Sequence, residues 1–342
     1  MERIHGSKTI ISKDTEIVLD YLERFPEAPS KTLARKIYSE NPALSSFNSV
    51  YSKIRYYRGQ NGKRQRKQLQ NTRFQQELKV DINMKEKFLP ESYASKRDTF
   101  IFPTGCKSVG VIGDVHIPYQ DNDAIEAAFA EMEKQKIESL LINGDLLDFY
   151  QLSFHEKDPR MVHFKQEIEA GRQFLEYCRF RFPDIPIYFI PGNHENRFER
   201  YLRVKASELL DMDEFRLDVL LHVAEYSVQY IPFRSKVVFG DFLIEHGDKI
   251  PGGGGVVPAR TALMRLKTNC LINHFHKTSS SSQRVYGPGE STTIRGYSLG
   301  CLCELTPEYL EINEWNHGFA ILKRNGNLVQ VNNYKIEGNQ IV

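Results

Sequence analysis

A chain of 342 residues, of which 40% are hydrophobic and 26% charged, has the composition of an ordinary globular protein of about two domains. No apolar stretch approaches the roughly 20 residues that a membrane span needs, and the N-terminus lacks the apolar core of a secretory signal. Five cysteines without regular spacing favour a reducing compartment, so we expect a cytoplasmic protein with no membrane partner.

The net charge of +2 conceals two parts of opposite sign. Residues 1–95 contain 18 Lys and Arg against 11 Asp and Glu, a net charge of +7, and the remaining 28 basic and 33 acidic residues give −5. We therefore expect a basic helical module at 1–67, a linker at 68–104 that includes a connecting helix, and a larger domain at 105–342. Oligomeric state is left open by the sequence.

Three short helices are predicted in the basic module. They span 14–25 with Asp14 as N-cap, 31–38 with Ser30 as N-cap, and a third segment from about Ser46. A turn before a basic third helix resembles a helix-turn-helix module.

The third helix runs into residues 53–67, which carry seven positive charges and no acid, with tyrosines interleaved. Such a stretch suits the phosphate backbone of DNA. A solvated basic linker or a protein-docking surface is the alternative. The predicted nucleic-acid contacts are Lys53, Arg55, Arg58, Lys63, Arg64, Arg66 and Lys67.

In the larger domain, apolar runs alternate with amphipathic stretches at about 123–135 and 163–181, and each run ends in polar residues. This pattern predicts a layered α/β sheet with one site at the carboxyl edge of its strands. A single Gly-Asp turn or a single histidine would be read as a solvated loop or a packing residue, but five such strand ends are hard to assign to packing. The clusters are Asp114 with His116, Asp145 with Asp148, Asn193 with His194, His246, and His274 with His276.

Nitrogen and oxygen ligands without thiolate suit first-row divalent ions. We expect these donors to hold divalent metal, manganese first, with iron, zinc or nickel as alternatives. Cys301 and Cys303 are spaced too closely for an ordinary zinc knuckle, and we expect both to pack inertly, as we expect of His222 and His317.

The ordered blocks over residues 105 to about 280 resemble the calcineurin-like metallophosphoesterase family. The resemblance implies a four-layer αββα sandwich of two mixed sheets between helices, with a binuclear metal centre. By it, Asp114, His116, Asp145 and His276 would hold one ion, and Asp145, Asn193, His246 and His274 the other. It also implies that His194 protonates the leaving oxygen and that Asp148 orients it.

Two departures from the family pattern bear on the substrate. Asn273 stands where many relatives have glycine, for which we expect only a local backbone difference. Phe149 and Tyr150 follow Asp148 where related protein phosphatases carry Arg-Gly, which argues against a phosphoprotein substrate. Arg197 and Arg200 could contact phosphate or form surface salt bridges.

Two later segments have weaker patterns. Glycines 252–255 suit either an anion-binding or moving loop or a plain flexible surface loop. Residues 319–322 and 328–331, separated by Asn325 and Gly326, predict a hairpin that completes the second sheet.

The sequence thus predicts a binuclear-metal phosphoesterase, most simply a phosphodiesterase or nuclease acting on DNA. One alternative is a small-molecule phosphatase or cyclic-nucleotide phosphodiesterase. A DNA-binding regulator with a vestigial catalytic domain is the alternative of another class.

Overall fold

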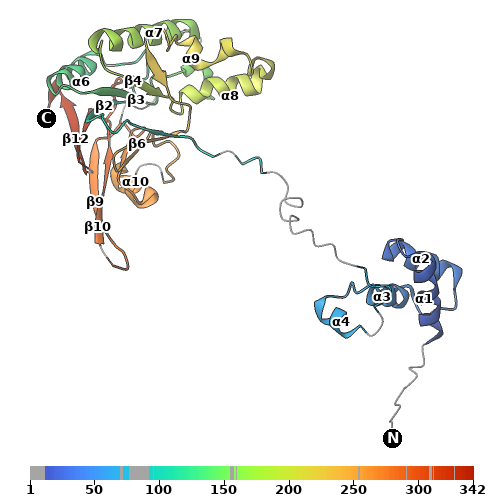
Figure 1. The fold of residues 1–342 in the computed structure, drawn as a ribbon. Coiled ribbons are helices and arrows are strands. Elements are labelled where there is room, and N and C mark those ends of the chain that lie inside the picture. Colours follow the sequence, from blue (N-terminus) through green and yellow to red (C-terminus); the bar gives the residue numbers. More distant parts are fainter. Residues whose placement is uncertain are drawn as a thin grey trace. The chain divides into compact units, whose positions relative to one another are not determined.

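The structure is a computed structural model that describes residues 12–69, 72–76, 92–94, 96–154, 158, 160–252, 255–289, 291–307, 310, 312–326 and 328–342. The chain divides into two compact units, Met1–Ala94 and Ser95–Val342 (Figure 1). In the described part of the chain, no helix is both long and apolar enough to cross a membrane. The predicted connecting helix of the linker lies mostly outside the described residues.

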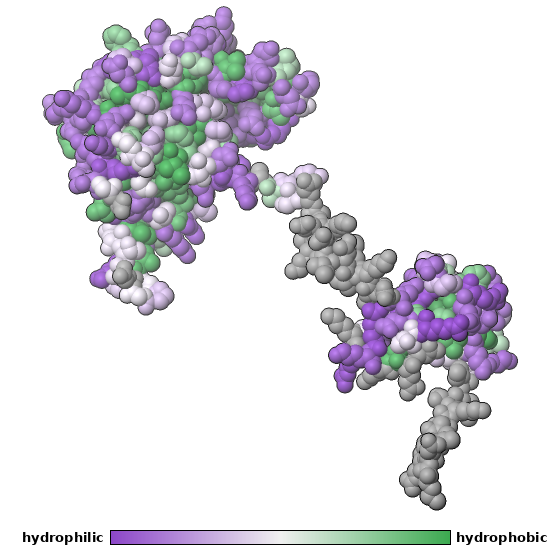
Figure 2. Space-filling view, in the orientation of Figure 1, coloured by the Kyte–Doolittle hydropathy of each residue, from purple (hydrophilic) through white to green (hydrophobic). Residues whose placement is uncertain are grey.

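The N-terminal unit is helical, as the sequence predicts. Its helices are α1 (Lys13–Arg24), α2 (Ser30–Glu40), α3 (Phe47–Tyr57) and α4 (Lys63–Gln68). Apolar side chains from α1, α2 and α3 form one core, and the visible surface of the unit is mostly hydrophilic (Figure 2). The Ser46 side chain accepts a hydrogen bond from the Ser49 amide and caps α3, as Ser and Thr do at helix starts. Asp14 lies in the first turn of α1, where the N-cap is Ser12.

The second unit alternates strands with helices in its first half and is β-rich in its second. In chain order it contains β1 (Thr99–Ile101), β2 (Ser108–Ile112), α6 (Asn122–Lys134), β3 (Ser139–Asn143), α7 (Phe164–Arg181), β4 (Ile187–Ile190), α8 (Glu195–Lys205), α9 (Leu217–Leu220), β5 (Val228–Tyr230), β6 (Lys236–Phe239), β7 (Phe242–Glu245), α10 (Pro258–Leu266), β8 (Cys270–Ile272), β9 (Ser279–Tyr286), β10 (Ser291–Ser298), β11 (His317–Asn325), β12 (Leu328–Glu337) and β13 (Gln340–Ile341).

The strands form two mixed sheets. The seven-stranded sheet has the order β13-β12-β11-β2-β3-β4-β5, and the six-stranded sheet the order β1-β6-β7-β8-β10-β9. Strands β2, β3, β4 and β5 pair in parallel, so their carboxyl ends meet at one edge. In the other sheet β7 and β8 are also parallel and end at a common edge.

Alternation along the buried strands explains why the two sheets stack. In β3, Leu140 and Ile142 pack with helices α6 and α7, whereas Leu141 faces the second sheet. The inter-sheet core joins Leu141 to side chains such as Phe239 and Ile244. Helix α10 covers the far face of the six-stranded sheet through Ala262 and Leu263. The predicted αββα sandwich is thereby confirmed (Figure 1).

The C-terminal hairpin forms as predicted, but it joins the other sheet. Strand β11 pairs antiparallel with β12 and, on its other side, with β2 of the seven-stranded sheet. The expectation that it completes the second sheet is wrong. In β11 both faces are apolar, because Phe319 and Ile321 face the helices while Ala320 and Leu322 face the inter-sheet core. Such a strand must be buried on both faces. Pairing with the free edge of β2 places it between the helices and the six-stranded sheet, which cover its two faces.

Strand β1 lies within the range expected to be linker. Its residues Thr99–Ile101 pair in parallel with β6, so ordered sheet structure begins before residue 105.

Candidate metal centre

The carboxyl ends of β2, β3, β4, β7 and β8 bring all seven predicted metal ligands into one cluster. Asp145 lies at its centre, with its Oδ2 atom 3.0 Å from His246 Nε2 and 3.9 Å from His116 Nε2. His116 Nε2 and His276 Nε2 are 3.2 Å apart, and His246 Nε2 is 3.1 Å from Asn193 Oδ1. Donor atoms therefore converge from five strand ends that are far apart in the sequence.

The backbone at these strand ends is strained. Five of the seven predicted ligands have positive φ angles: Asp114 52°, His116 50°, Asp145 52°, His274 73° and His276 53°. A non-glycine residue in this left-handed region costs on the order of 1–3 kcal/mol and persists where surrounding structure enforces it. Such strain concentrates at functional sites, because it turns side chains toward a common point that regular strand geometry would not reach.

Hydrogen bonds at Nδ1 orient two of the imidazoles. His116 Nδ1 lies 3.1 Å from Asp148 Oδ1, and His246 Nδ1 donates to the Asn143 carbonyl oxygen at 2.9 Å. With the Nδ1 proton held in this way, the lone pair of each neutral ring lies on Nε2, which faces the cluster. This is the arrangement by which proteins prepare histidine for metal binding.

The electrostatics of the cluster favour a cation. Burial by itself would lower the pKa of His246, but the Asp145 carboxylate outweighs it and raises that pKa to about 10. Burial likewise opposes protonation of His276, and Asp114 raises its pKa to about 10. Among the residues that the structure describes, none donates a hydrogen bond to the buried Asp114 Oδ1. Positive charge is thus required beside both carboxylates, and these nitrogen and oxygen donors fit divalent metal ions.

Among the described residues, three groups of donor atoms are close enough to hold an ion. His116, Asp145 and His194 form one group, Asp145, His246 and His274 form another, and His116, His276 and Cys303 form the third. Asp145 belongs to the first two.

Glu195 fastens the two loops that carry Asp145 and Asn193, a role that the sequence pattern did not reveal. It is 2% exposed, and its carboxylate accepts hydrogen bonds from the amides of Asp145, Leu147 and Gly192 at 3.0, 2.8 and 2.7 Å. A Cβ atom on Gly192 would lie 2.2 Å from Asp145 Oδ1, so this position needs glycine. In the sequence, the only signal for Glu195 was its position directly after Gly192, Asn193 and His194.

His194 lies between Asp148 and the centre. Its Nδ1 atom is 2.8 Å from the Asp148 carbonyl oxygen and 3.2 Å from Asp148 Oδ1, and its Nε2 atom is 3.8 Å from Asp145 Oδ2. Burial lowers the pKa of His194, but Asp145 and Asp148 outweigh it, so the pKa is raised overall. For Asp148, burial opposes ionisation, while hydrogen bonds from His116 and His194 hold its pKa below the ordinary value.

The two arginines on α8 differ in position. Arg197 Nη2 is 3.0 Å from His194 Nε2, and Arg197 Nη1 donates to the Asp148 carbonyl oxygen at 2.9 Å, so Arg197 borders the cluster. The Arg200 guanidinium instead lies 3.3 Å from the centre of the Phe154 ring. The structure therefore brings Arg197 to the site and leaves Arg200 apart from it.

Other predicted features have local structural explanations. Asn273 Oδ1 accepts a hydrogen bond from Asn143 Nδ2 at 2.8 Å, and both side chains are buried. Cys303, expected to pack inertly, is buried, and its Sγ atom lies 3.9 Å from His276 Nδ1. Gly253 and Gly254 lie outside the described residues, so the predicted glycine loop stays a prediction.

The basic residues of the N-terminal unit are not equally available. Arg58 is 1% exposed and donates to the carbonyl oxygens of Phe25, Pro26 and Ala28, so it closes the helical core and is not at the surface expected for it. Arg64 is exposed.

The remaining predicted nucleic-acid contacts also differ in whether their side chains have partners within the unit. Arg66 donates to the Gln76 carbonyl oxygen, and Arg55 to that of Gln60. Lys53 lies 3.8 Å from Asp14, while Lys67 is exposed. The side chain of Lys63 lies outside the described part.

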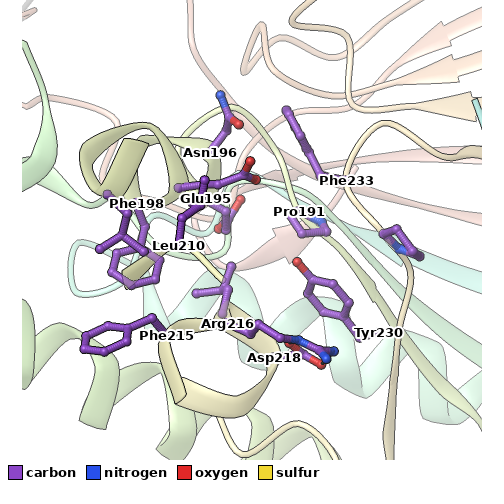
Figure 3. Close-up of a pocket in the computed structure, with 14 residues that line it drawn as sticks. Pro191, Glu195, Asn196, Phe198, Leu210, Phe215, Arg216, Asp218, Tyr230 and Phe233 are labelled. Carbon is purple, nitrogen blue, oxygen red and sulfur yellow. Dashed lines mark hydrogen bonds and ion pairs between the residues drawn. The ribbon is translucent and has the colours of Figure 1, made fainter. Parts of the chain in front are cut away.

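Three cavities adjoin the strand ends. One, of about 350 Å³, lies beside α8 and is lined by Glu195, Phe198 and Tyr230 among others; none of the seven predicted ligands borders it (Figure 3). A second, of about 390 Å³, is bordered by His116, His276 and Asp148. A third, of about 540 Å³, is bordered by His246. The second and third cavities therefore both reach the donor cluster, the second at two of its histidines.

The fold and this cluster define a metal-dependent phosphoric ester hydrolase. Residues 107–294 match the calcineurin-like phosphoesterase family, and the chain belongs to that family. The Gene 54 proteins of Mycobacterium phages L5 and D29 are each 27% identical to it over 238 residues, which cover 66% of this chain and 91% of the relative.

Two of the solved structures with a similar fold come from Cryptosporidium parvum and E. coli, and both have low sequence identity to this chain. Vacuolar Protein Sorting 29 from Cryptosporidium parvum is 15% identical, covers 69% of this chain and 95% of its own, and has a TM-score of 0.37. Yfce, a phosphoesterase from E. coli, is 13% identical, with coverage of 69% and 96% and a TM-score of 0.31.

Proposed function

We propose that the chain hydrolyses phosphodiesters in DNA with two divalent ions, which we expect to be manganese. The observation that carries the two-ion centre is the position of Asp145 Oδ2, which lies 3.9 Å from His116 Nε2 of one proposed ligand set and 3.0 Å from His246 Nε2 of the other. A carboxylate has two oxygens and can bridge two ions, as in two-metal phosphoesterases.

The residues fall into two ligand sets. Asp114, His116, Asp145 and His276 would hold one ion, and Asp145, Asn193, His246 and His274 the other. When bound, the ions supply Lewis acidity to a phosphoryl oxygen and lower the pKa of a bound water.

The leaving oxygen is protonated by His194. The Asp148 carbonyl oxygen and carboxylate hold its Nδ1 proton, which leaves Nε2 to face the reacting group. The raised pKa of His194 keeps an acidic proton on the ring near neutral pH. Arg197 borders the same nitrogen and would donate to a phosphoryl oxygen of the substrate, which accepts from both groups.

DNA is the substrate that the basic N-terminal unit would bring to the catalytic unit. Arg64 and Lys67 are exposed and free of carboxylate partners among the described residues, so both can neutralise phosphates. Arg58 is excluded from this set because its guanidinium is buried.

The first test is hydrolysis of bis-p-nitrophenyl phosphate and of single- and double-stranded DNA with Mn²⁺. We expect Asp145→Asn and His194→Ala to abolish turnover of both kinds of substrate. Lys165→Gln, an exposed position on α7, is the control that leaves activity unchanged. Turnover that survives Asp145→Asn would reject the assigned centre.

A second test separates DNA from small substrates. The double change Arg64→Gln and Lys67→Gln should weaken DNA cleavage and its salt dependence while turnover of the small diester is unaffected. Cleavage of the small diester with DNA untouched would favour the small-molecule phosphodiesterase instead. Salt-dependent DNA binding without turnover of any ester would favour the vestigial regulator.

A further inference from the structure

The cavity beside His116 and His276 has aromatic walls. Tyr119, Tyr150 and Trp315 line it together with Met161, and each of these side chains is half-buried, so part of its surface faces the cavity. The Trp315 ring centre lies 4.1 Å from that of His276, at 61°. A flat apolar space therefore begins directly at the metal-binding histidines.

Tyr150 and Trp315 lie where this chain departs from, or extends beyond, the family pattern. Tyr150 lies one residue beyond Phe149, at the position where the sequence departs from the Arg-Gly pair of related protein phosphatases. Phe149 turns into the core, with φ 51° and no exposed surface, and Tyr150 then lines the cavity. Trp315 and Cys303 lie beyond residues 107–294, outside the stretch that matches the family.

The charges around the cavity disfavour a second phosphate there. Asp148, Asp158 and Glu304 line it, and the described residues around it include no Lys or Arg. Asp158 is partly neutralised by the exposed Arg160, whose Nε lies 2.9 Å from its Oδ1. An uncharged ring that offers N–H donors fits such walls, whereas an anionic group is repelled.

We propose that this cavity binds one unpaired nucleobase of the phosphoester substrate, stacked against Trp315 and Tyr150, with its phosphate directed to His116 and His276. The inference rests on the proposed function and narrows its substrate class to nucleotide esters with a free base. A volume of about 390 Å³ is at the small end of ligand sites, so a base still paired in a duplex would have to leave its stack to enter.

The first test uses the fluorescence of Trp315, because it is the only tryptophan in the chain. Thymidine 5′-monophosphate is titrated into the full-length protein with Mg²⁺, beside ribose 5-phosphate, which has the phosphate but no base. We expect saturable quenching by the nucleotide alone. Equal quenching by both, or none by the nucleotide, would overturn the assignment.

The second test compares two esters that share the p-nitrophenolate leaving group. Thymidine 5′-(p-nitrophenyl phosphate) carries a base, and methyl p-nitrophenyl phosphate does not. Trp315→Ala should lower kcat/KM for the thymidine ester about tenfold, because the base loses its stacking partner. The methyl ester should lose much less than the thymidine ester, and Trp315→Phe should restore most of the loss on the thymidine ester.

Tyr286→Ala is the matched control, because Tyr286 is 78% exposed and lies outside the cavity. Equal loss on both esters in Trp315→Ala would show that Trp315 only supports His276, and would overturn the base-binding role. If the wild-type protein hydrolyses neither ester, the proposed function fails. The fluorescence titration then tests by itself whether the cavity binds a nucleobase.

Discussion

Glu167 on α7 offers a direct test of the electrostatics beneath the site. It is 2% exposed, and its carboxylate accepts a hydrogen bond from the Phe149 amide. The pKa of Glu167 is raised to about 8, mainly by burial. The Phe149 amide and His194 act to lower this pKa, while Asp148 and Glu195 act to raise it. The predicted change is Glu167→Gln, which keeps an oxygen acceptor for the Phe149 amide and removes the titration.

The sign of the effect follows from proton binding. Below the ordinary value of 4.5, Glu167 is protonated in both the folded and the unfolded chain. Between 4.5 and about 8 the unfolded chain releases this proton and the folded chain keeps it, so the wild-type protein loses stability as pH rises. Over three pH units in this interval, the free energy of unfolding of the wild-type protein falls by about 4 kcal/mol, and half that change would still be measurable.

The assay is urea unfolding, followed by circular dichroism, of the wild-type protein and of Glu167→Gln. Changes in metal ligation are common to both proteins and cancel in the difference between their free energies of unfolding. We expect that difference to move in favour of the variant from pH 5 to pH 8, by about 4 kcal/mol, and to level off above. A difference that is flat over this range would refute the raised pKa.

Three further predictions concern the site and the N-terminal unit. Gly192→Ala should displace Asp145 and abolish high-affinity Mn²⁺ binding by calorimetry, whereas Gly105→Ala, with open space around its Cβ, should bind normally; equal affinities would contradict the close approach. Arg58→Met should destabilise the N-terminal unit by about 3 kcal/mol in urea unfolding by leaving buried carbonyl oxygens unpaired, in contrast to the exposed Arg64→Met. Chelation should lower the thermal midpoint of the wild-type protein by removing on the order of 3 kcal/mol of binding energy, and an Asp145→Asn variant that loses as much would contradict the ligand assignment.

The residue patterns of the chain predicted a layered α/β sheet and the candidate donor residues, and the family resemblance added the two-sheet sandwich. Apolar runs of strand length ended in Asp, Asn or His, and parallel strands must bring such ends to one edge. The residue patterns could predict this because both signals are local: a strand is recognised by its own residues, and a tight turn by the glycine or asparagine within it.

The hydrogen-bond partners that complete these local signals come from distant parts of the chain and follow from the fold. The acceptor that orients His246 is the carbonyl oxygen of Asn143, about a hundred residues away along the chain. Arg58 is a second example. Its charge predicts a surface position, but its guanidinium is buried because it donates to three carbonyl oxygens.

The C-terminal hairpin and the aromatic cavity were likewise beyond local reasoning. Strand β11 pairs with β2, in a place where both of its faces are buried. The residues of the hairpin alone do not indicate which of the two sheets it joins. Trp315 lies beside His276 only after β11 has been placed. Burial, hydrogen-bond partners and cavity walls arise between segments distant in sequence, which is why the type of chemistry could be predicted from the chain while its substrate pocket needed the fold.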